Sequence, residues 1–257
     1  MKKIIDFSRF SSIKAGAMTE VEIIDSMSWN KEGYFIVGAA SNLLVTSNTK
    51  KLARLSKEFD YIKIEGDTLV IGGATSSGKI LSFAKKHNIA NFEFLSKIPG
   101  LLGGMVKMNA GLKEWEIFNH LISIKTSSGV FNKSEIVHSY RHTQIEAVIF
   151  EAVFELSFGY SNELYEKFLQ MRQNQPKLPS AGSCFKNPLP HFAGKLIEDV
   201  GLKGAKIGNM GFSSEHANFL VNHGNGTAQE ALELIDLAKK LVLDKFGVFL
   251  EEEIIII

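Results

Sequence analysis

A turn of very small residues, Val37-Gly-Ala-Ala-Ser-Asn42, lies between two segments of strand-forming composition, residues 34–37 and 43–46. A dinucleotide-binding βαβ unit needs a helix directly after its glycine-rich turn, so a second strand at this place argues against that fold. Residues with almost no side chain nevertheless allow a pyrophosphate to lie against backbone N–H groups. A tight β-turn without a ligand is the alternative, and the turn alone does not decide between them.

Strand and helix patterns are mixed along the rest of the chain, and no internal repeat is present. Residues 61–72 predict a hairpin around a central turn, and residues 77–87 have the apolar spacing of a helix. Residues 193–200 predict a second, short helix. The capping box Thr227-Ala-Gln-Glu230 opens a longer helix that ends at Gly247. These patterns predict an α+β fold.

Composition excludes several classes of partner. Lys and Arg number 29 against 28 Asp and Glu, so no basic excess favours nucleic acid. A single cysteine cannot form an internal disulfide, and no Cys/His cluster has zinc-ligand spacing. The first residues lack the apolar run of a signal peptide, and no segment has the length of a membrane helix. We therefore expect a cytoplasmic protein with no metal, no nucleic acid and no membrane partner.

A second glycine-rich segment, Ile98-Pro-Gly-Leu-Leu-Gly-Gly-Met-Val-Lys-Met-Asn-Ala-Gly111, holds four glycines and a proline in fourteen residues. It predicts a structured loop with a short helix inside. Such loops often approach phosphate groups closely, since glycine has no side chain to keep them away. A tightly turned connection without a ligand is again the alternative.

The only cysteine, Cys184, stands next to a serine, Ser183, in the stretch Pro-Ser-Ala-Gly-Ser-Cys-Phe-Lys-Asn-Pro. If this stretch is extended, the two side chains point to opposite faces. No base lies nearby in sequence, so a nucleophile has no local support. A thiol in this setting is more often a buried packing residue than a reactive one.

Two other stretches could also carry charge into a site. In Tyr140-Arg-His-Thr143 the arginine could present its guanidinium to a carboxylate, although a surface arginine is the ordinary reading. Residues 248–257 predict a final strand with a cluster of three successive glutamates before it. If the glutamates are extended, Glu251 and Glu253 share a face while Glu252 faces away. One of them could act as an acid or base, and solvated charge is the alternative.

The order of these motifs along the chain resembles that of the UDP-N-acetylenolpyruvoylglucosamine reductases, a family of flavoenzymes. The turn at 38–44 is similar to the family's Gly-x-Gly-Ser-Asn-Leu-Leu. The loop at 98–111 matches Ile-Pro-Gly-x-x-Gly-Gly-x-x-x-x-Asn-Ala-Gly residue for residue. The further matches are Tyr-Arg at 140–141, Gly-Ser-x-Phe-Lys-Asn-Pro at 182–188, Ala-Gly-x-Leu-Ile-Glu at 193–198, His-Ala-Asn-Phe-Leu-Val-Asn at 216–222 and Leu-Glu-x-Glu at 250–253.

The resemblance implies an FAD-binding module of the vanillyl-alcohol-oxidase type followed by a substrate domain. Its subdomains would span residues 1–55 and 56–160, and the substrate domain 161–257, with the last strand able to return to the FAD module. The implied reaction is the NADPH-dependent reduction of UDP-N-acetylglucosamine enolpyruvate to UDP-N-acetylmuramate in peptidoglycan precursor synthesis, by a monomer. The alternatives are an FAD-linked oxidase of the same fold or a non-catalytic nucleotide-sugar-binding protein.

The resemblance also implies roles for individual residues. Arg141 would pair with the substrate carboxylate, Glu253 would assist the enolic intermediate, and Ser183 would protonate the α-carbon. Substrate contacts fall on Tyr140, Lys186, Asn187 and His216. The residues that would hold the cofactor are Gly38, Ala39, Ala40, Ser41, Asn42, Leu43, Ile98, Pro99, Gly100, Gly103, Gly104, Asn109, Ala110 and Gly111.

The sequence departs from the family pattern at several places. Ala40 replaces the second glycine of the first turn, and His142-Thr143 replaces Asp-Ser after the arginine. The chain lacks the arginine that follows Glu253 in the family. Only 41 residues separate Arg141 from Ser183, which predicts the short family type without a tyrosine-bearing lid.

Overall fold

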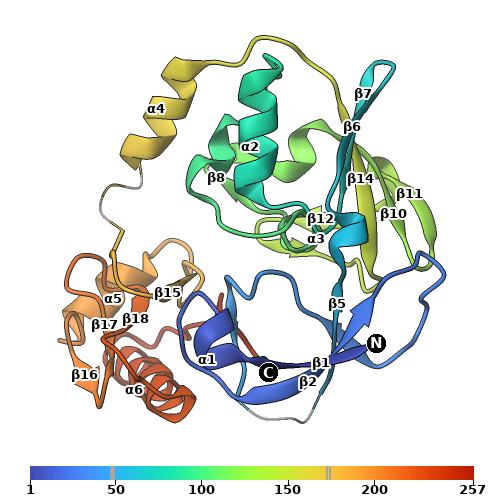
Figure 1. Ribbon diagram of the computed structural model, residues 1–257. Helices are drawn as coiled ribbons and strands as arrows, with labels where there is room; N and C mark the ends of the chain where they lie inside the picture. Colours follow the sequence, from blue (N-terminus) through green and yellow to red (C-terminus); the bar gives the residue numbers. More distant parts are fainter. Residues whose placement is uncertain (47–49, 172, 174) are drawn as a thin grey trace. The chain divides into compact units, whose positions relative to one another are not determined.

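A computed structural model describes residues 1–46, 50–171, 173 and 175–257 (Figure 1). The chain divides into two compact units. The first consists of Met1–Lys3, Val21–Ala39 and Leu52–Gln173, and the second of Ile4–Glu20, Ala40–Lys51 and Asn174–Ile257. Both units contain helices together with mostly antiparallel strands, which confirms the α+β prediction.

The elements have the following bounds. The α-helices are α1 (Phe7–Phe10), α2 (Ser77–Lys86), α3 (Leu102–Lys107), α4 (Asn162–Met171), α5 (Ala193–Asp199) and α6 (Ala228–Phe246). The 3-10 helices are η1 (Lys57–Phe59), η2 (Glu93–Lys97), η3 (Ile117–His120) and η4 (Lys133–Glu135). The strands are β1 (Lys2–Asp6), β2 (Met18–Ile24), β3 (Tyr34–Ile36), β4 (Leu43–Leu44), β5 (Lys51–Leu55), β6 (Ile62–Glu65), β7 (Thr68–Gly72), β8 (Gly111–Leu112), β9 (Trp115–Glu116), β10 (Leu121–Thr126), β11 (Gly129–Asn132), β12 (His138–Ser139), β13 (His142–Thr143), β14 (Ile149–Glu155), β15 (Ser180–Ser183), β16 (Lys206–Ile207), β17 (Met210–Phe212), β18 (Phe219–Asn222) and β19 (Ile255–Ile256).

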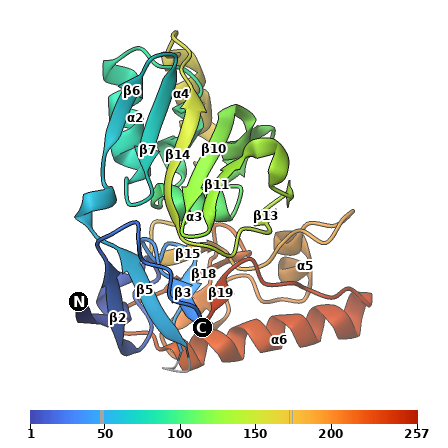
Figure 2. The same ribbon diagram turned by 90° about the vertical axis from the view of Figure 1, so that its right-hand side faces the viewer.

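The main sheet of the first unit has the strand order β11-β10-β14-β7-β6, and Figure 2 shows these strands side by side. Each neighbouring pair runs antiparallel, and β6 with β7 forms the predicted hairpin. Helix α2 buries Ile80 and Ala84 in the same cluster as Leu69 and Ile71 of β7. This confirms the helix predicted at residues 77–87.

A separate polar cluster stabilises the other part of the first unit, where β2 and β5 pair in parallel. The carboxylate of Glu22, on β2, is buried. It accepts hydrogen bonds from Trp29 Nε1 and Tyr34 Oη, both at 2.8 Å, and pairs with Lys31 Nζ at 2.7 Å. The bonds from Lys31 and Trp29 together outweigh the effect of burial and lower the pKa of Glu22 to about 2.

The second unit has a sheet of order β15-β18-β17-β16, against which α6 packs. The apolar stripe of α6, including Leu234 and Ala238, lies in one core cluster with Met210 and Leu220 of the sheet. The capping box at the start of α6 is formed as predicted, and Gly247 ends the helix with a φ of 68°.

The predicted strand at the end of the chain is present, and the three glutamates precede it. Glu252 forms an isolated antiparallel bridge with Phe185, and the chain then bends at residues 253–254. Only β19 is a strand, and it pairs in parallel with β4. The final segment therefore pairs first with Phe185 and then with β4. The bend at residues 253–254 allows this change of partner.

We expect Glu22 to make stability depend on pH. Its pKa is about 2 in the folded protein against an ordinary 4.5, so its contribution is complete above about pH 4.5 and is lost as the pH falls toward 2. Glu22→Gln should lower the free energy of unfolding at pH 7 by roughly 2 kcal/mol. This value is smaller than the full pKa shift would give, because Lys31 is exposed and solvent screens its charge. Urea unfolding at about pH 7 and about pH 3 should show the deficit shrinking at the lower value.

The matched control is Glu32→Gln, since Glu32 is exposed in the same connection between β2 and β3. It should leave the free energy of unfolding nearly unchanged at both pH values. An equal deficit for Glu22→Gln at both pH values would contradict the assignment.

Candidate active site

The glycine-rich loop at 98–111 is tied to the chain segment that follows β7. The N–H of Ser77 donates to the Gly100 carbonyl at 3.0 Å, and the N–H of Gly103 donates to the Gly73 carbonyl at 2.9 Å. A Cβ at Gly103 would lie 3.3 Å from that carbonyl oxygen, which is closer than most side chains tolerate. Glycine at 103 therefore lets α3 begin this close to the sheet, and the predicted short helix in the loop is confirmed.

Gly38, at the start of the small-residue turn, adjoins the loop at 98–111 within the first unit. A Cβ placed on Gly38 would lie 3.9 Å from Leu101 Cβ, and a Cβ on Gly104 would meet nothing within 4 Å among the described residues. Asn109, at the far end of the loop, is fully buried. Its Oδ1 has no hydrogen-bond partner in the part of the chain that the structure describes. The arrangement combines backbone open to close approach with a buried acceptor that a bound molecule could satisfy.

Ala40, which stands where the family pattern has a glycine, has a backbone conformation that favours glycine. Its φ is 51°, in the left-handed region, and the residue is buried. Its carbonyl oxygen accepts a hydrogen bond from the N–H of Ser12 at 3.2 Å. An alanine in this conformation costs about 1 kcal/mol relative to glycine.

Arg141 lies at the tip of the hairpin formed by β12 and β13. Its guanidinium donates to the carbonyl oxygens of Asn109 at 3.3 Å and Gly111 at 2.6 Å, and stands 5.0 Å from the centre of the Tyr140 ring. These contacts place Arg141, from the Tyr-Arg motif, against the Asn-Ala-Gly end of the glycine-rich loop at 98–111. The guanidinium therefore has a defined orientation.

Ser183 ends β15, and the residues after it are clamped by Asn218. The N–H of Cys184 donates to the backbone carbonyl of Asn218 at 2.7 Å. The Asn218 side chain then bonds both backbone groups of Phe185, accepting at 3.0 Å and donating at 2.8 Å. Sequence reasoning did not single out Asn218, although it stands in the intact His-Ala-Asn-Phe motif. Its buried amide substitutes for a strand partner.

Glu253 lies against the same segment. Its N–H donates to the Cys184 carbonyl at 2.9 Å, and the N–H of Lys186 donates to the Glu251 carbonyl at 2.8 Å. The second unit thus brings the predicted residues Ser183 and Glu253 onto bonded neighbouring segments. Arg141 belongs to the first unit, and its convergence with these two residues stays a prediction.

The other two glutamates of the final segment are engaged in ion pairs. Glu251 Oε1 lies 2.5 Å from Lys186 Nζ, and Glu252 Oε1 lies 2.7 Å from Lys239 Nζ. The side chain of Glu251 is 72% exposed. Solvated charge is therefore the better description of Glu251, and the acid–base role expected of Glu253 stays a prediction.

The predicted substrate contacts also have structural partners. Asn187 is exposed, and its Oδ1 accepts a hydrogen bond from the N–H of Ala193 at the start of α5, at 3.0 Å. His216 is half-buried, and its Nδ1 accepts from the N–H of Asn218 at 3.3 Å. Burial lowers the pKa of His216. Their contact with substrate stays a prediction, as does that of Lys186 and Tyr140.

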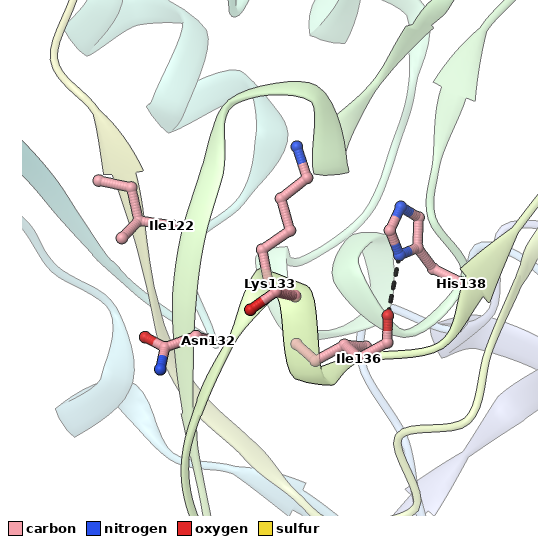
Figure 3. A pocket seen from close by; sticks show the side chains of 6 residues that line it. Ile122, Asn132, Lys133, Ile136 and His138 are labelled. Atoms are coloured by element: carbon pink, nitrogen blue, oxygen red, sulfur yellow. Dashed lines mark hydrogen bonds between the residues drawn. The ribbon is translucent and has the colours of Figure 1, made fainter.

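A surface hollow of about 440 Å³ lies on the first unit and contains none of the residues predicted for chemistry. Figure 3 shows Lys133 and His138 at its rim, with the hydrogen bond of 3.0 Å between His138 Nδ1 and the Ile136 carbonyl. His138 also stacks on Phe118, with ring centres 4.4 Å apart. These contacts give His138 a structural role at the base of the β12–β13 hairpin.

Two absences hold for the described residues. No group of three or more His, Cys, Asp or Glu side chains is arranged to hold a metal ion. No described helix combines the length and the apolar character needed to span a membrane.

Cys184 is a core residue, as the sequence suggested, with 1% of its surface exposed. Burial raises the pKa of its thiol far above the ordinary value, and the carboxylates of Glu252 and Glu253 act in the same direction. We expect an aromatic disulfide reagent at pH 8 to leave the folded protein unlabelled and to label one thiol after urea unfolding. Rapid labelling of the folded protein, followed by absorbance, would contradict this.

Comparison with known proteins connects these features to one family. Residues 174–257 match the family model described as UDP-N-acetylenolpyruvoylglucosamine reductase, C-terminal domain. The UDP-N-acetylenolpyruvoylglucosamine reductase of Helicobacter hepaticus is 48% identical over 255 residues, which cover 98% of this chain and 97% of that protein. The Campylobacter jejuni (strain RM1221) enzyme of the same name is 44% identical over 259 residues, which cover 99% of this chain and 100% of that protein.

A solved structure agrees with these sequence relatives. The crystal structure of UDP-N-acetylenolpyruvylglucosamine reductase from Thermus caldophilus matches with a TM-score of 0.89 at 27% identity. The match covers 100% of this chain and 98% of that one. On this evidence, the chain belongs to the UDP-N-acetylenolpyruvoylglucosamine reductase family.

Proposed function

We propose that this protein reduces UDP-N-acetylglucosamine enolpyruvate to UDP-N-acetylmuramate in peptidoglycan precursor synthesis, with FAD as cofactor and NADPH as reductant. The observation that carries the proposal is the bond between the Ser183 and Glu253 segments at the Cys184 carbonyl. The reaction needs a proton donor and a second acid beside one substrate, and this bond keeps two suitable groups on neighbouring segments. Membership of the family supports the same reaction.

The residues of the glycine-rich segments fit a flavin nucleotide. Gly38 adjoins the 98–111 loop, and Gly104 leaves open space where a side chain would stand. Oδ1 of the buried Asn109 could accept a hydrogen bond from the bound group. The residues that would hold FAD are therefore those of the loop together with the turn at 38–43. When bound, FAD would supply to the substrate a hydride that originates from NADPH.

Hydride addition at the β-carbon of the enolpyruvyl group leaves negative charge at the α-carbon, next to the substrate carboxylate. Arg141 would pair with that carboxylate. Its guanidinium is already oriented by the carbonyls of Asn109 and Gly111, so little reorganisation is needed when substrate binds. Tyr140, whose ring lies beneath the guanidinium, would line the same place.

The second unit would supply the acids. Glu253, in its protonated form, would stabilise the enolic charge, and the Ser183 hydroxyl would donate the proton to the α-carbon. A serine hydroxyl is a very weak acid in water, so the step requires a strongly basic carbon and a site from which water is excluded. Lys186, Asn187 and His216 would contact the rest of the nucleotide sugar.

The first test is spectroscopic. The protein purified under native conditions should carry the absorbance of oxidised flavin, or acquire it when FAD is added, and NADPH should bleach it. Adding the enolpyruvyl substrate should restore the absorbance. A protein that neither contains nor takes up flavin would refute the proposal and favour a non-catalytic nucleotide-sugar-binding protein. Fast reoxidation by air without substrate would instead favour an oxidase.

Ser183 and Cys184 form a matched pair of variants at adjacent positions. Ser183→Ala should leave flavin reduction by NADPH unchanged and slow the substrate-dependent step at least about a hundredfold, because it removes the proton donor. Cys184→Ala should keep that step within a few-fold of the unmodified protein, because the thiol only packs. Stopped-flow absorbance measures both steps. Equal rates for Ser183→Ala and the unmodified protein would remove Ser183 from this role.

A further inference from the structure

Asn42 makes a contact that the resemblance does not assign. The resemblance places Asn42 in the cofactor-binding turn. In the structure its side-chain Nδ2 donates to the backbone carbonyl of Glu253 at 2.9 Å, across 211 positions of sequence. We propose that Asn42 is a positioning residue that holds Glu253 in place for proton chemistry. This inference rests on the function proposed above.

Glu253 is held through its backbone from two sides. On one side its N–H donates to the Cys184 carbonyl at 2.9 Å. On the other its carbonyl accepts from the Asn42 amide. These two bonds lie at the bend of residues 253–254, where no ladder of strand hydrogen bonds fixes the backbone. The direction in which the Glu253 side chain leaves the chain is therefore set by the two bonds together.

The same asparagine also takes part in the strand pairing that follows. Its backbone carbonyl accepts from the N–H of Ile255 at 3.0 Å. The pairing then continues for a short distance, with the N–H of Ile257 donating to the Leu44 carbonyl at 3.0 Å. Strand β19 has only two residues, and short terminal strands fray readily. The Asn42 side chain extends this weak pairing by one bond, up to the bend that carries Glu253.

Geometry of this kind affects rate more than stability. Loss of one hydrogen bond lowers stability only modestly, whereas a catalytic group displaced by about 1 Å can lose about a hundredfold in rate. Loss of the Asn42 amide should therefore slow the step in which Glu253 acts by about ten- to a hundredfold. Because Asn42 also lies in the turn proposed to hold FAD, the rates are compared per mole of bound flavin.

The test compares Asn42→Ala and the isosteric Asn42→Asp, which keeps the shape of the side chain and loses the donor. Both should slow the substrate-dependent reoxidation of flavin by more than they slow its reduction by NADPH, with each rate measured by stopped flow per mole of bound flavin. Hydrogen exchange followed by mass spectrometry should show faster exchange of residues 251–257 in both variants. This second measurement does not depend on activity.

A double-mutant cycle separates positioning from general loosening of the fold. In a Glu253→Gln background, adding Asn42→Ala should slow the substrate-dependent reoxidation of flavin by less than about threefold. The carboxyl group that Asn42 positions is then already absent. The control is Asn119→Ala, which removes a bond of 2.8 Å from another asparagine amide to the Glu114 carbonyl. It should have no effect on the step in either background.

Three outcomes would overturn the inference: unchanged substrate-dependent rates in both Asn42 variants, full additivity with Glu253→Gln, or loss of flavin as the main defect. The last would return Asn42 to the cofactor site. Failure of the proposed function itself would look different, because the unmodified protein would then lack flavin or fail to turn over the enolpyruvyl substrate.

Discussion

The carbonyl oxygen of Cys184 organises the chemically important part of the second unit. It accepts the N–H of Glu253 at 2.9 Å and that of Ile254 at 3.3 Å, while the N–H of the same residue is bound by Asn218. A buried peptide group with both of its polar atoms satisfied is expensive to disrupt. The positions of Ser183 before it and Glu253 across from it follow from this one residue, whose side chain has no part in the proposed chemistry.

Local sequence patterns predicted the elements that local physics determines. The capping box of α6, its glycine C-cap, the β6–β7 hairpin and α2 are all formed where the patterns indicated. Each depends on residues a few positions apart, such as Thr227 and Glu230. The family motifs predicted roles for Ser183 and Glu253, but they did not predict that the segments of these two residues would be hydrogen-bonded to each other.

Long-range pairings could not be predicted in this way. Nothing near Asn42 in sequence indicates that its amide bonds the carbonyl of Glu253, and the clamp of Asn218 on Phe185 spans 33 positions. The final segment was predicted to end in a strand because of its run of isoleucines, but its composition does not indicate a bend before that strand. It bends because it has two different partners, Phe185 and β4, and partners are a property of the fold.

The parallel pairing of β4 with β19 also has a consequence for synthesis on the ribosome. β4 leaves the ribosome long before β19 has been translated, since Asn42 and Glu253, which lie just before these strands and bond to each other, are 211 positions apart. During that interval the backbone of Leu43 and Leu44 has no native partner on that edge, and their buried side chains cannot yet pack fully. The second unit therefore cannot mature co-translationally in chain order. Its early segments must wait, exposed or held by a chaperone, until the last residues arrive.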